Sequence, residues 1–189
     1  MLTFRPAEAH DAAKIAPIML LAMEDIVYYF IGERNLQKAV DVLTYFIAQE
    51  GNQYSYTNIL VAEEDQEILG QLCLYDGGQL EQLRQPILNH LKEVYQVEVP
   101  SAEYETQAGE IYIDTIAVSA NAQGKGIGKQ LLQFAIDKFV HNQGKTLGLL
   151  VDKDNPAAKK LYLNIGFKIV NELQIFKKEM EHLQLAPEA

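Results

Sequence analysis

The residues best suited to chemistry in this chain form the segment Gln123-Gly-Lys-Gly-Ile-Gly128, which joins an expected strand to an expected helix. Closely spaced glycines at such a junction leave several backbone N–H groups open at the positive end of a helix, and these groups bind a diphosphate without any charged side chain. Glycine suits these positions because a Cβ atom would hold the phosphate away from the backbone, and because some of the φ angles are expected to be positive. The simpler interpretation is a glycine-rich turn without a ligand.

Two well-known phosphate loops do not fit this segment. The P-loop pattern ends in Gly-Lys-Ser/Thr, whereas Gly128 is followed by Lys129 and Gln130, so the hydroxyl that binds magnesium is missing. The dinucleotide-binding pattern needs Gly-x-Gly-x-x-Gly early in a parallel βαβ unit, whereas these glycines fall as Gly-x-Gly-x-Gly. Neither pattern explains the loop.

The charge of the chain is unevenly distributed. The formal net charge of −10 disfavours nucleic acid as a partner, because its phosphates would be repelled. Between residues 120 and 160, seven lysines stand against three acids, a local net charge of +4 that leaves −14 for the rest of the chain. This distribution suggests an anionic ligand near residues 120–160 and a cationic ligand elsewhere. Lysines on exposed helix faces are the alternative explanation.

Length and composition indicate a single domain that spans residues 1–189. The chain is 48% hydrophobic and 22% charged, ordinary values for a globular protein with one core. No apolar tract reaches the length of a membrane span, the start lacks a secretory signal, and the single Cys73 cannot form an internal disulfide. We therefore expect a cytoplasmic protein without membrane contact. The four histidines show no ligand spacing, so we expect no metal.

Hydrophobic periodicity predicts a mixed α/β chain with an antiparallel front half and a β-α-β-α-β back half. The expected strands cover residues 2–5, 59–63, 68–75, 111–118, 146–151, 167–175 and 176–183. The expected helices cover residues 11–31, 35–50, 79–96, 125–142 and 156–165. The apolar stripe of the third helix comprises Leu80, Leu83, Ile87, Leu88, Leu91 and Val94.

Three segments resemble the GNAT acetyltransferases. The loop that begins at Gln123 matches the family's Gln/Arg-x-x-Gly-x-Gly/Ala pattern, and the run Ile113-Asp-Thr-Ile-Ala-Val-Ser119 resembles the family's fourth strand. Downstream, Asn155-Pro-Ala-Ala-Lys-Lys-Leu-Tyr-Leu-Asn-Ile-Gly-Phe167 resembles its second signature, an Asn-x-x-Ala…Leu-Tyr…Gly-Phe run. The resemblance implies a three-layer fold with a central mixed sheet of about six or seven strands, flanked by helices and splayed at the cofactor site. It also makes residues 77–108 a helical insertion between the hairpin and the central strand.

The resemblance further implies acetyl-CoA, a coenzyme A thioester, as co-substrate. Backbone N–H groups of the glycine loop would hold the pyrophosphate, and the pantetheine arm would lie along the central strand like an extra strand. Asn155 resembles the family residue that orients the cofactor amide, and it is equally suited to cap the following helix. The cofactor-binding residues predicted in this way are Ile116, Ala117, Val118, Gln123, Gly124, Lys125, Gly126, Ile127, Gly128, Lys129, Asn155, Ala158 and Tyr162.

Tyr162 is the predicted catalytic acid. When an amine attacks a thioester, the leaving thiolate needs a proton that a phenol can donate. The alternative is that Tyr162 is an aromatic residue that only fills a gap.

The attacking amine must lose a proton, so a base is expected nearby. Glu110, Tyr112 and Asp114 share one strand face by the period of two. Asp114 matches an acidic position of diamine-type family members and is our first candidate for the base, with Glu110 second. A solvated carboxylate without a role is the alternative for both. Histone-type members have their glutamate where this chain has Tyr112, so a histone-like mechanism is not expected.

We therefore expect acetyl transfer from acetyl-CoA to a primary amine in a ternary complex. The acidic front half favours a cationic acceptor, such as a polyamine, an amino sugar, an amino acid or a protein amine. The insertion either lines the acceptor pocket or forms a homodimer surface. Two other functions stay open: an acetyl-CoA sensor without turnover, against which Tyr162 argues, and a partner-binding module. The acids of the insertion are Glu81, Glu93, Glu98, Glu103 and Glu105, and the candidate partner-binding stripe is Leu80, Leu83 and Leu91.

Overall fold

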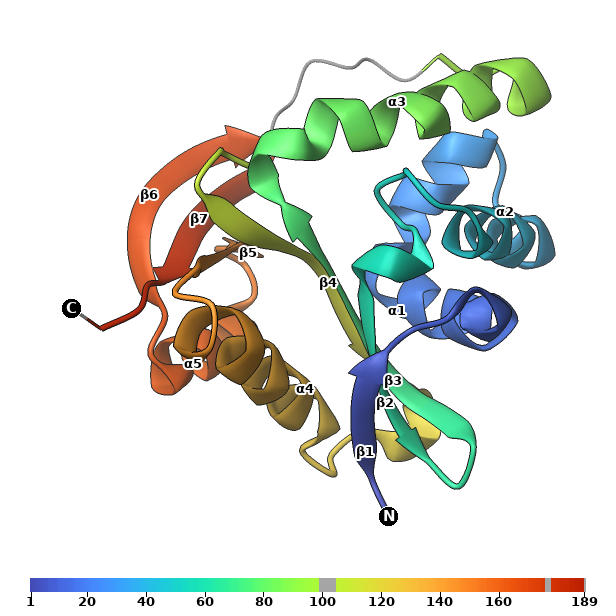
Figure 1. The fold of residues 1–189 in the computed structure, drawn as a ribbon. Coiled ribbons are helices and arrows are strands. Elements are labelled where there is room, and N and C mark those ends of the chain that lie inside the picture. The colour runs from blue at the N-terminus through green and yellow to red at the C-terminus, as the bar shows by residue number, and fades with distance from the viewer. Residues whose placement is uncertain (99–104, 176–177, 189) are drawn as a thin grey trace.

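The computed structural model describes residues 1–98, 105–175 and 178–188. Within them, the centre is one sheet of seven strands in the order β1-β2-β3-β4-β5-β7-β6 (Figure 1). The strands are β1 (Thr3–Pro6), β2 (Ile59–Glu64), β3 (Glu67–Asp76), β4 (Glu110–Val118), β5 (Thr146–Asp152), β6 (Lys168–Ile175) and β7 (Lys178–Leu185). The predicted mixed sheet is confirmed. Of the predicted final strand pair, Phe176 lies outside the described residues.

One neighbouring pair of strands in this sheet is parallel. β4 and β5 run in the same direction and are connected through α4 (Ile127–Ala135), while the other described pairs are antiparallel. A parallel pair needs a crossover connection, and the helix after the glycine loop supplies it. The last strand, β7, lies between β5 and β6, so that β6 is at the edge of the sheet. This position brings β7 next to the parallel pair.

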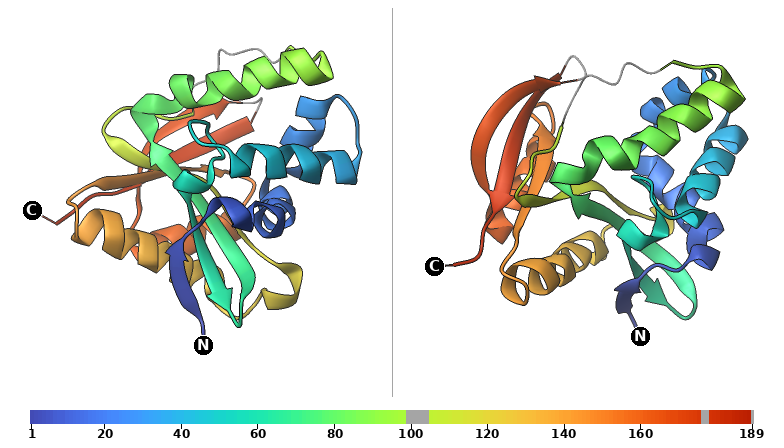
Figure 2. Two further views of the ribbon diagram at one scale, coloured as in Figure 1. Left: turned by 45° about the vertical axis from the view of Figure 1, so that its right-hand side comes forward. Right: turned by 45° about the horizontal axis from the view of Figure 1, so that its top comes forward.

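Helices cover both faces of the sheet and complete the predicted three layers (Figures 1 and 2). The helices α1 (Ala12–Ile31), α2 (Leu36–Ala48) and α3 (Leu80–His90) form the layer on one face, and α4 and α5 (Pro156–Ile165) form the layer on the other. Gly32 ends α1 with a left-handed φ of 72°, and Asn35 begins α2 by accepting a hydrogen bond from the backbone N–H of Lys38. These two signals separate what would otherwise be one long apolar helix.

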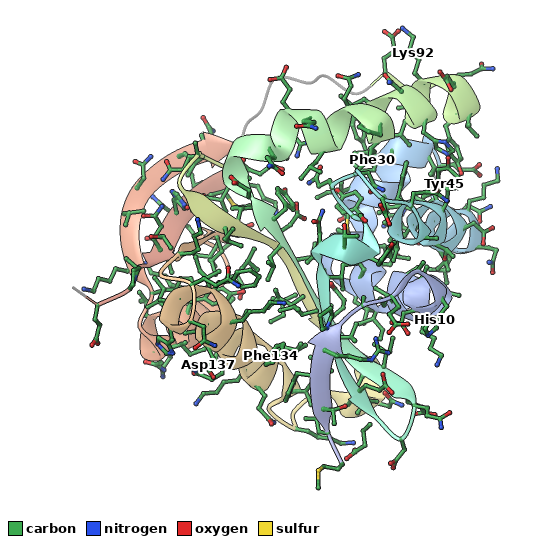
Figure 3. The ribbon with its side chains drawn as sticks, in the orientation of Figure 1. His10, Phe30, Tyr45, Lys92, Phe134 and Asp137 are labelled. Carbon is green, nitrogen blue, oxygen red and sulfur yellow. The ribbon has the colours of Figure 1, made fainter. Side chains whose placement is uncertain are left out.

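Two apolar cores lie on the two faces, because successive residues of the strands point to opposite sides. Side chains fill both layers in Figure 3, where Phe134 of α4 and Tyr45 of α2 are labelled. Phe134 stacks on Phe4 of β1 with ring centroids 5.7 Å apart, and Tyr45 stacks on His90 of α3 at 4.4 Å. The second contact joins α3, which lies in the insertion, to α2.

The insertion helix buries most of its predicted apolar stripe in the core of its own chain. Leu80, Ile87 and Leu91 are buried and Leu83 is partly buried, whereas Val94 is 58% exposed. An apolar stripe packed in this way cannot contact another protein. The hypothesis of a partner-binding module that uses this stripe is therefore wrong.

The N-terminal strand is joined to α1 by a charged cluster. Arg5 donates hydrogen bonds to both oxygens of Asp11, at 2.7 and 3.1 Å, and to Glu63 at 2.7 Å. Asp11 also accepts a hydrogen bond from the backbone N–H of Glu8 at 2.9 Å.

Among the described helices, none alone is long and apolar enough to cross a membrane. Ala9–Ile31 and Leu36–Ala48, bent by 98°, meet that criterion only as a pair.

Candidate functional site

The central strands β4 and β5 separate part-way along their length. They pair only over residues 110–113 and 146–149; beyond these, β4 continues along β3 and β5 continues along β7. The facing edges of residues 114–118 and 150–152 therefore carry backbone groups without a strand partner. Buried backbone groups need partners, and an extended ligand arm can supply them as an added strand. The predicted cofactor residues 116–118 lie on this edge.

A bulge marks the point of separation. Cys73 of β3 pairs with Thr115 and Leu74 pairs with Ile113, so Asp114 has no partner on β3. The extra residue bends the strand and interrupts the alternation of its side chains. Asp114 and Thr115 consequently both make side-chain contacts on the α1–α3 face, where Thr115 bonds to Gln71.

The glycine loop lies between the end of β4 and the start of α4. Gly124 and Gly126 have φ angles of +77° and +76°, the left-handed region in which a Cβ is strained. Gly126 is the N-cap of α4, and none of the described side chains caps the helix, so the N–H groups of its first turn remain open. The predicted opening of backbone amides is therefore present. Lys125 and Lys129 are exposed beside it, and Gln123 donates to the carbonyl of Val118 at 3.2 Å.

The helix α5 begins at Pro156 with Asn155 as its N-cap, as predicted. The side chain of Asn155 accepts a hydrogen bond from the backbone N–H of Ala158 at 3.1 Å, and Pro156 occupies the first helical position. Tyr162, two turns into the helix, is half-buried on the α4–α5 face, with its ring 5.9 Å from that of Phe167. Burial raises the pKa of Tyr162. No described residue accepts a hydrogen bond from its hydroxyl.

Asp114 is held on the opposite face by two donors. Its Oδ2 accepts hydrogen bonds from the Tyr75 hydroxyl and from Gln53 Nε2, both at 2.6 Å. Its Oδ1 has no partner among the described residues. Burial raises the pKa of Asp114, although the hydrogen bonds from Tyr75 and Gln53 and the charge of Arg84 act in the other direction. The result is a carboxylate fixed at one oxygen and open at the other.

The insertion reaches this carboxylate through Gln53. Arg84 of α3 donates to Gln53 Oε1 at 3.2 Å and forms an ion pair with Glu105. The side chain of Glu105 is only 9% exposed, and burial raises its pKa. Among the acidic residues of the insertion that were predicted to line the acceptor pocket, Glu105 is thus linked to Asp114 through Arg84 and Gln53. Glu81, Glu93 and Glu98 are exposed, and Glu103 lies outside the described residues.

Glu110 is fully buried at the start of β4. Its Oε2 accepts a hydrogen bond from Gln184 at 2.7 Å and lies 2.8 Å from His182 Nε2, both on β7. Glu110 and Asp114 thus occupy the same face of the sheet, as the period of two predicts, but they bind different partners. The side chain of Glu110 is 0% exposed.

The sequence and fold of this chain match those of one known protein family. A model of the acetyltransferase (GNAT) family matches residues 33–167, well over half of the chain, including the glycine loop, the parted strands and α5. The chain belongs to the GNAT acetyltransferase family. A solved structure described as an acetyltransferase is 31% identical to this GNAT chain, with a TM-score of 0.84, and the match covers 98% of this chain and all 100% of the other.

Two further proteins resemble this GNAT chain, one in sequence and one in structure. A mycothiol acetyltransferase from Renibacterium salmoninarum is 41% identical over 59 residues, which are 31% of this chain and 17% of that protein. The chain therefore matches well under two thirds of the length of its curated relatives. A putative acetyltransferase from Salmonella typhimurium, solved with its cofactor acetyl-CoA, is 18% identical with a TM-score of 0.58, over 99% of this chain and 94% of the other. At that identity, the likeness concerns the fold alone.

Family membership confirms the predicted GNAT resemblance, the fold and the class of acetyltransferase. Several residues around the site were not predicted from the sequence. These are Gln53, Tyr75, Arg84 and His182. Each reaches its partner from a distant part of the chain, and none belongs to a motif. His182 lies in β7, a strand of mostly polar residues, so nothing in the local sequence sets it apart.

Proposed function

We propose that this protein transfers the acetyl group of acetyl-CoA to a primary amine by direct attack in a ternary complex. The observation that carries the proposal is the uncapped, glycine-lined start of α4 at the end of β4, beside the gap where β4 and β5 part. The first feature suits a pyrophosphate and the second suits an extended arm. The relative from Salmonella with acetyl-CoA supports the choice of ligand.

The residues around the loop fit such a ligand. A Cβ atom built on Gly124 would meet nothing within 4 Å, and one on Gly126 would meet only Gln130, at 4.0 Å. The space over these amides is therefore open. We propose that the N–H groups of residues 124–128 hold the pyrophosphate, that Lys125 and Lys129 contact its oxygens, and that residues 116–118 pair with the pantetheine arm. Asn155 and Ala158 would contact the arm from the start of α5.

Tyr162 is the proposed acid. Its raised pKa keeps the phenol protonated at neutral pH, which is the state needed to donate a proton to a leaving thiolate. In support of this role, Tyr162 lies on α5, which packs on β5, and its side chain packs against the α4–α5 core.

The amine is proposed to approach from the α1–α3 side. There Asp114 presents an open oxygen. Burial raises the pKa of Tyr112, the charges of Asp114, Glu105 and Glu110 raise it further, and the charge of Arg84 acts in the other direction. Three carboxyl groups around one tyrosine favour a cationic acceptor over a neutral or anionic one. Polyamines, amino sugars, amino acids and protein amines all satisfy this condition.

Two measurements test the proposal. Calorimetry with coenzyme A and acetyl-CoA should detect binding, and a thiol-release assay with spermidine, glucosamine, lysine methyl ester and a peptide amine should detect turnover with at least one of them. Absence of cofactor binding would refute the proposal. Binding without thiol release for an enlarged amine panel would instead favour an acetyl-CoA sensor.

A further inference from the structure

A second polar group, built around His182, lies on the α1–α3 face of the sheet. The imidazole Nε2 lies 2.8 Å from Glu110 Oε2, and Gln184 Nε2 donates to the same oxygen at 2.7 Å. The side chains of Glu110 and His182 are 0% and 7% exposed. Glu110 Oε1 is buried without a partner among the described residues, and His182 Nδ1 also has none there.

The sheet is shaped to accommodate this group. Gly148 of β5 lies between Glu110 and β7, and a Cβ atom built on Gly148 would lie 1.9 Å from Glu110 Oε2. No side chain can occupy that space while Glu110 keeps its position. The glycine therefore allows a carboxylate of β4 to cross β5 and reach an imidazole on β7.

The register places His182 one strand away from the gap between β4 and β5, directly across β5 from it. His182 pairs with Leu150, the first residue of β5 beyond its last pairing with β4, which is Leu149 with Ile113. The imidazole lies on the same face as Asp114, on the other side of the gap.

We propose that His182 takes the proton from the attacking amine and that Glu110 acts only by orienting the imidazole. This inference rests on the proposed acetyl transfer and assigns its base. When Nε2 carries the hydrogen and donates to Glu110, the Nδ1 lone pair is free to accept a proton, as in the oriented histidine of other acyl-transfer sites. Glu110, the predicted second candidate for the base, then becomes a positioning residue.

The step balances. The acceptor first releases one proton to solvent, so that the attacking nitrogen is neutral. This nitrogen forms a bond to the thioester carbonyl carbon and gives a second proton to His182 Nδ1, and the carbon–sulfur bond breaks as Tyr162 donates its proton to the sulfur. Solvent later removes the proton from the imidazole and returns one to the phenol. Asp114, with its open oxygen, serves to attract the cationic acceptor.

The surroundings of the imidazole contain few other charges. β5 presents Gly148 and Leu150 on this face, and β6 presents Asn171 opposite His182. On β4, Tyr112 and Asp114 lie on the same face as Glu110, the one charged group that contacts the imidazole among the described residues. A titration seen in the activity can therefore be assigned by removing these groups in turn.

The test uses the full chain with acetyl-CoA and the most active amine of the panel. We expect His182→Gln to lower kcat by about 100-fold or more, to leave the KM for acetyl-CoA unchanged, and to remove the acidic limb of the pH profile of kcat/KM. Imidazole added to His182→Ala should restore part of the activity, which a structural role would not allow. His141→Gln is the control, because His141 is exposed on the α4 side and pairs with Asp137 at 2.9 Å.

The role of Glu110 is tested by non-additivity. Glu110→Gln should lower kcat, and the double variant Glu110→Gln/His182→Gln should be no slower than His182→Gln alone, because Glu110 acts through the imidazole. Gly148→Ala should lower activity in the wild type but add no loss to Glu110→Ala, whose shortened side chain leaves room for the new methyl group. Additive losses, or an unchanged pH profile in His182→Gln, would overturn the inference. Failure of the wild type to bind coenzyme A would overturn the proposed function itself, so the two failures are distinguishable.

Discussion

Replacing Gly126 by alanine should have a small effect on the stability of the fold and a large effect on the affinity for coenzyme A. Gly126 has a φ angle of +76°, and the added methyl group would meet nothing closer than Gln130 Nε2 at 4.0 Å. The variant is therefore not destabilised by a steric collision. Only the left-handed backbone conformation at position 126 is unfavourable for alanine. That conformation costs roughly 1 to 2 kcal/mol for a residue with a Cβ. For a chain of this length, the melting temperature should fall by about 2 to 8 °C.

The affinity for coenzyme A should change by much more than this strain implies. The methyl group would stand over the open amides, and each hydrogen bond from an N–H group to a charged ligand contributes about 1.5 to 3 kcal/mol. Loss of one such bond weakens binding by about 10- to 100-fold. Calorimetric titration with coenzyme A, done well below the melting temperature, measures this directly.

Gly144→Ala is the matched control. Gly144 has a φ angle of +63°, and an added Cβ would meet nothing within 4 Å, but it lies after the far end of the helix that begins at Gly126. Both variants should lose similar thermal stability, and only Gly126→Ala should lose affinity. Equal coenzyme A affinities in the two variants would show that the amides at the start of α4 do not bind the diphosphate.

Four further predictions concern side chains of the site and of the N-terminal cluster. Tyr162→Phe should lower kcat by about tenfold or more in the thiol-release assay without changing the affinity for coenzyme A; equal rates would remove the phenol from the mechanism. Asp114→Asn should lower kcat/KM for a cationic amine by about tenfold or more. Because burial raises the pKa of Asp114, its native form is favoured when protonated, so the stability of the wild type relative to this variant should fall as the pH rises above about 4. For Asp11, burial acts to raise the pKa, but the hydrogen bonds from Arg5 and the Glu8 N–H outweigh it and the pKa is lowered. This carboxylate therefore stabilises the fold above its unfolded pKa, and Asp11→Ala should lower the free energy of unfolding in urea by about 1 to 3 kcal/mol near pH 7 and by clearly less near pH 2.

The elements of this fold were predictable because their signals are local. Asn155 and Pro156 predict the start of α5, and the structure shows that start with the expected cap. Gly32 and Asn35 likewise separate α1 from α2. The glycine loop was predictable for the same reason, since the strand, the small residues and the helix follow one another directly in the chain. Local signals of this kind do not depend on the order of strands.

The contacts across the sheet could not be predicted, since they depend on that order. Glu110 and His182 are 72 residues apart, and they meet only because β7 lies next to β5 and Gly148 leaves room between them. In the sequence, Gly148 resembles any glycine within a strand. The bulge at Asp114 had no signal either, and it shifts Thr115 onto the face that a strict period of two assigns to its neighbours.

The two faces of the sheet separate the two proton transfers that the proposed reaction needs. Tyr162 lies with the α4–α5 core, while Asp114 and His182 lie with or near the α1–α3 core. An acid and a base that contacted each other would form a hydrogen bond, and the imidazole lone pair would then not be free to take a proton from the amine. In the proposed reaction, their position on opposite sides of the sheet would leave the imidazole free for the amine, while burial raises the pKa of Tyr162 and keeps the phenol protonated. The separation of two paired strands after only four residue pairs is therefore the feature on which both transfers depend.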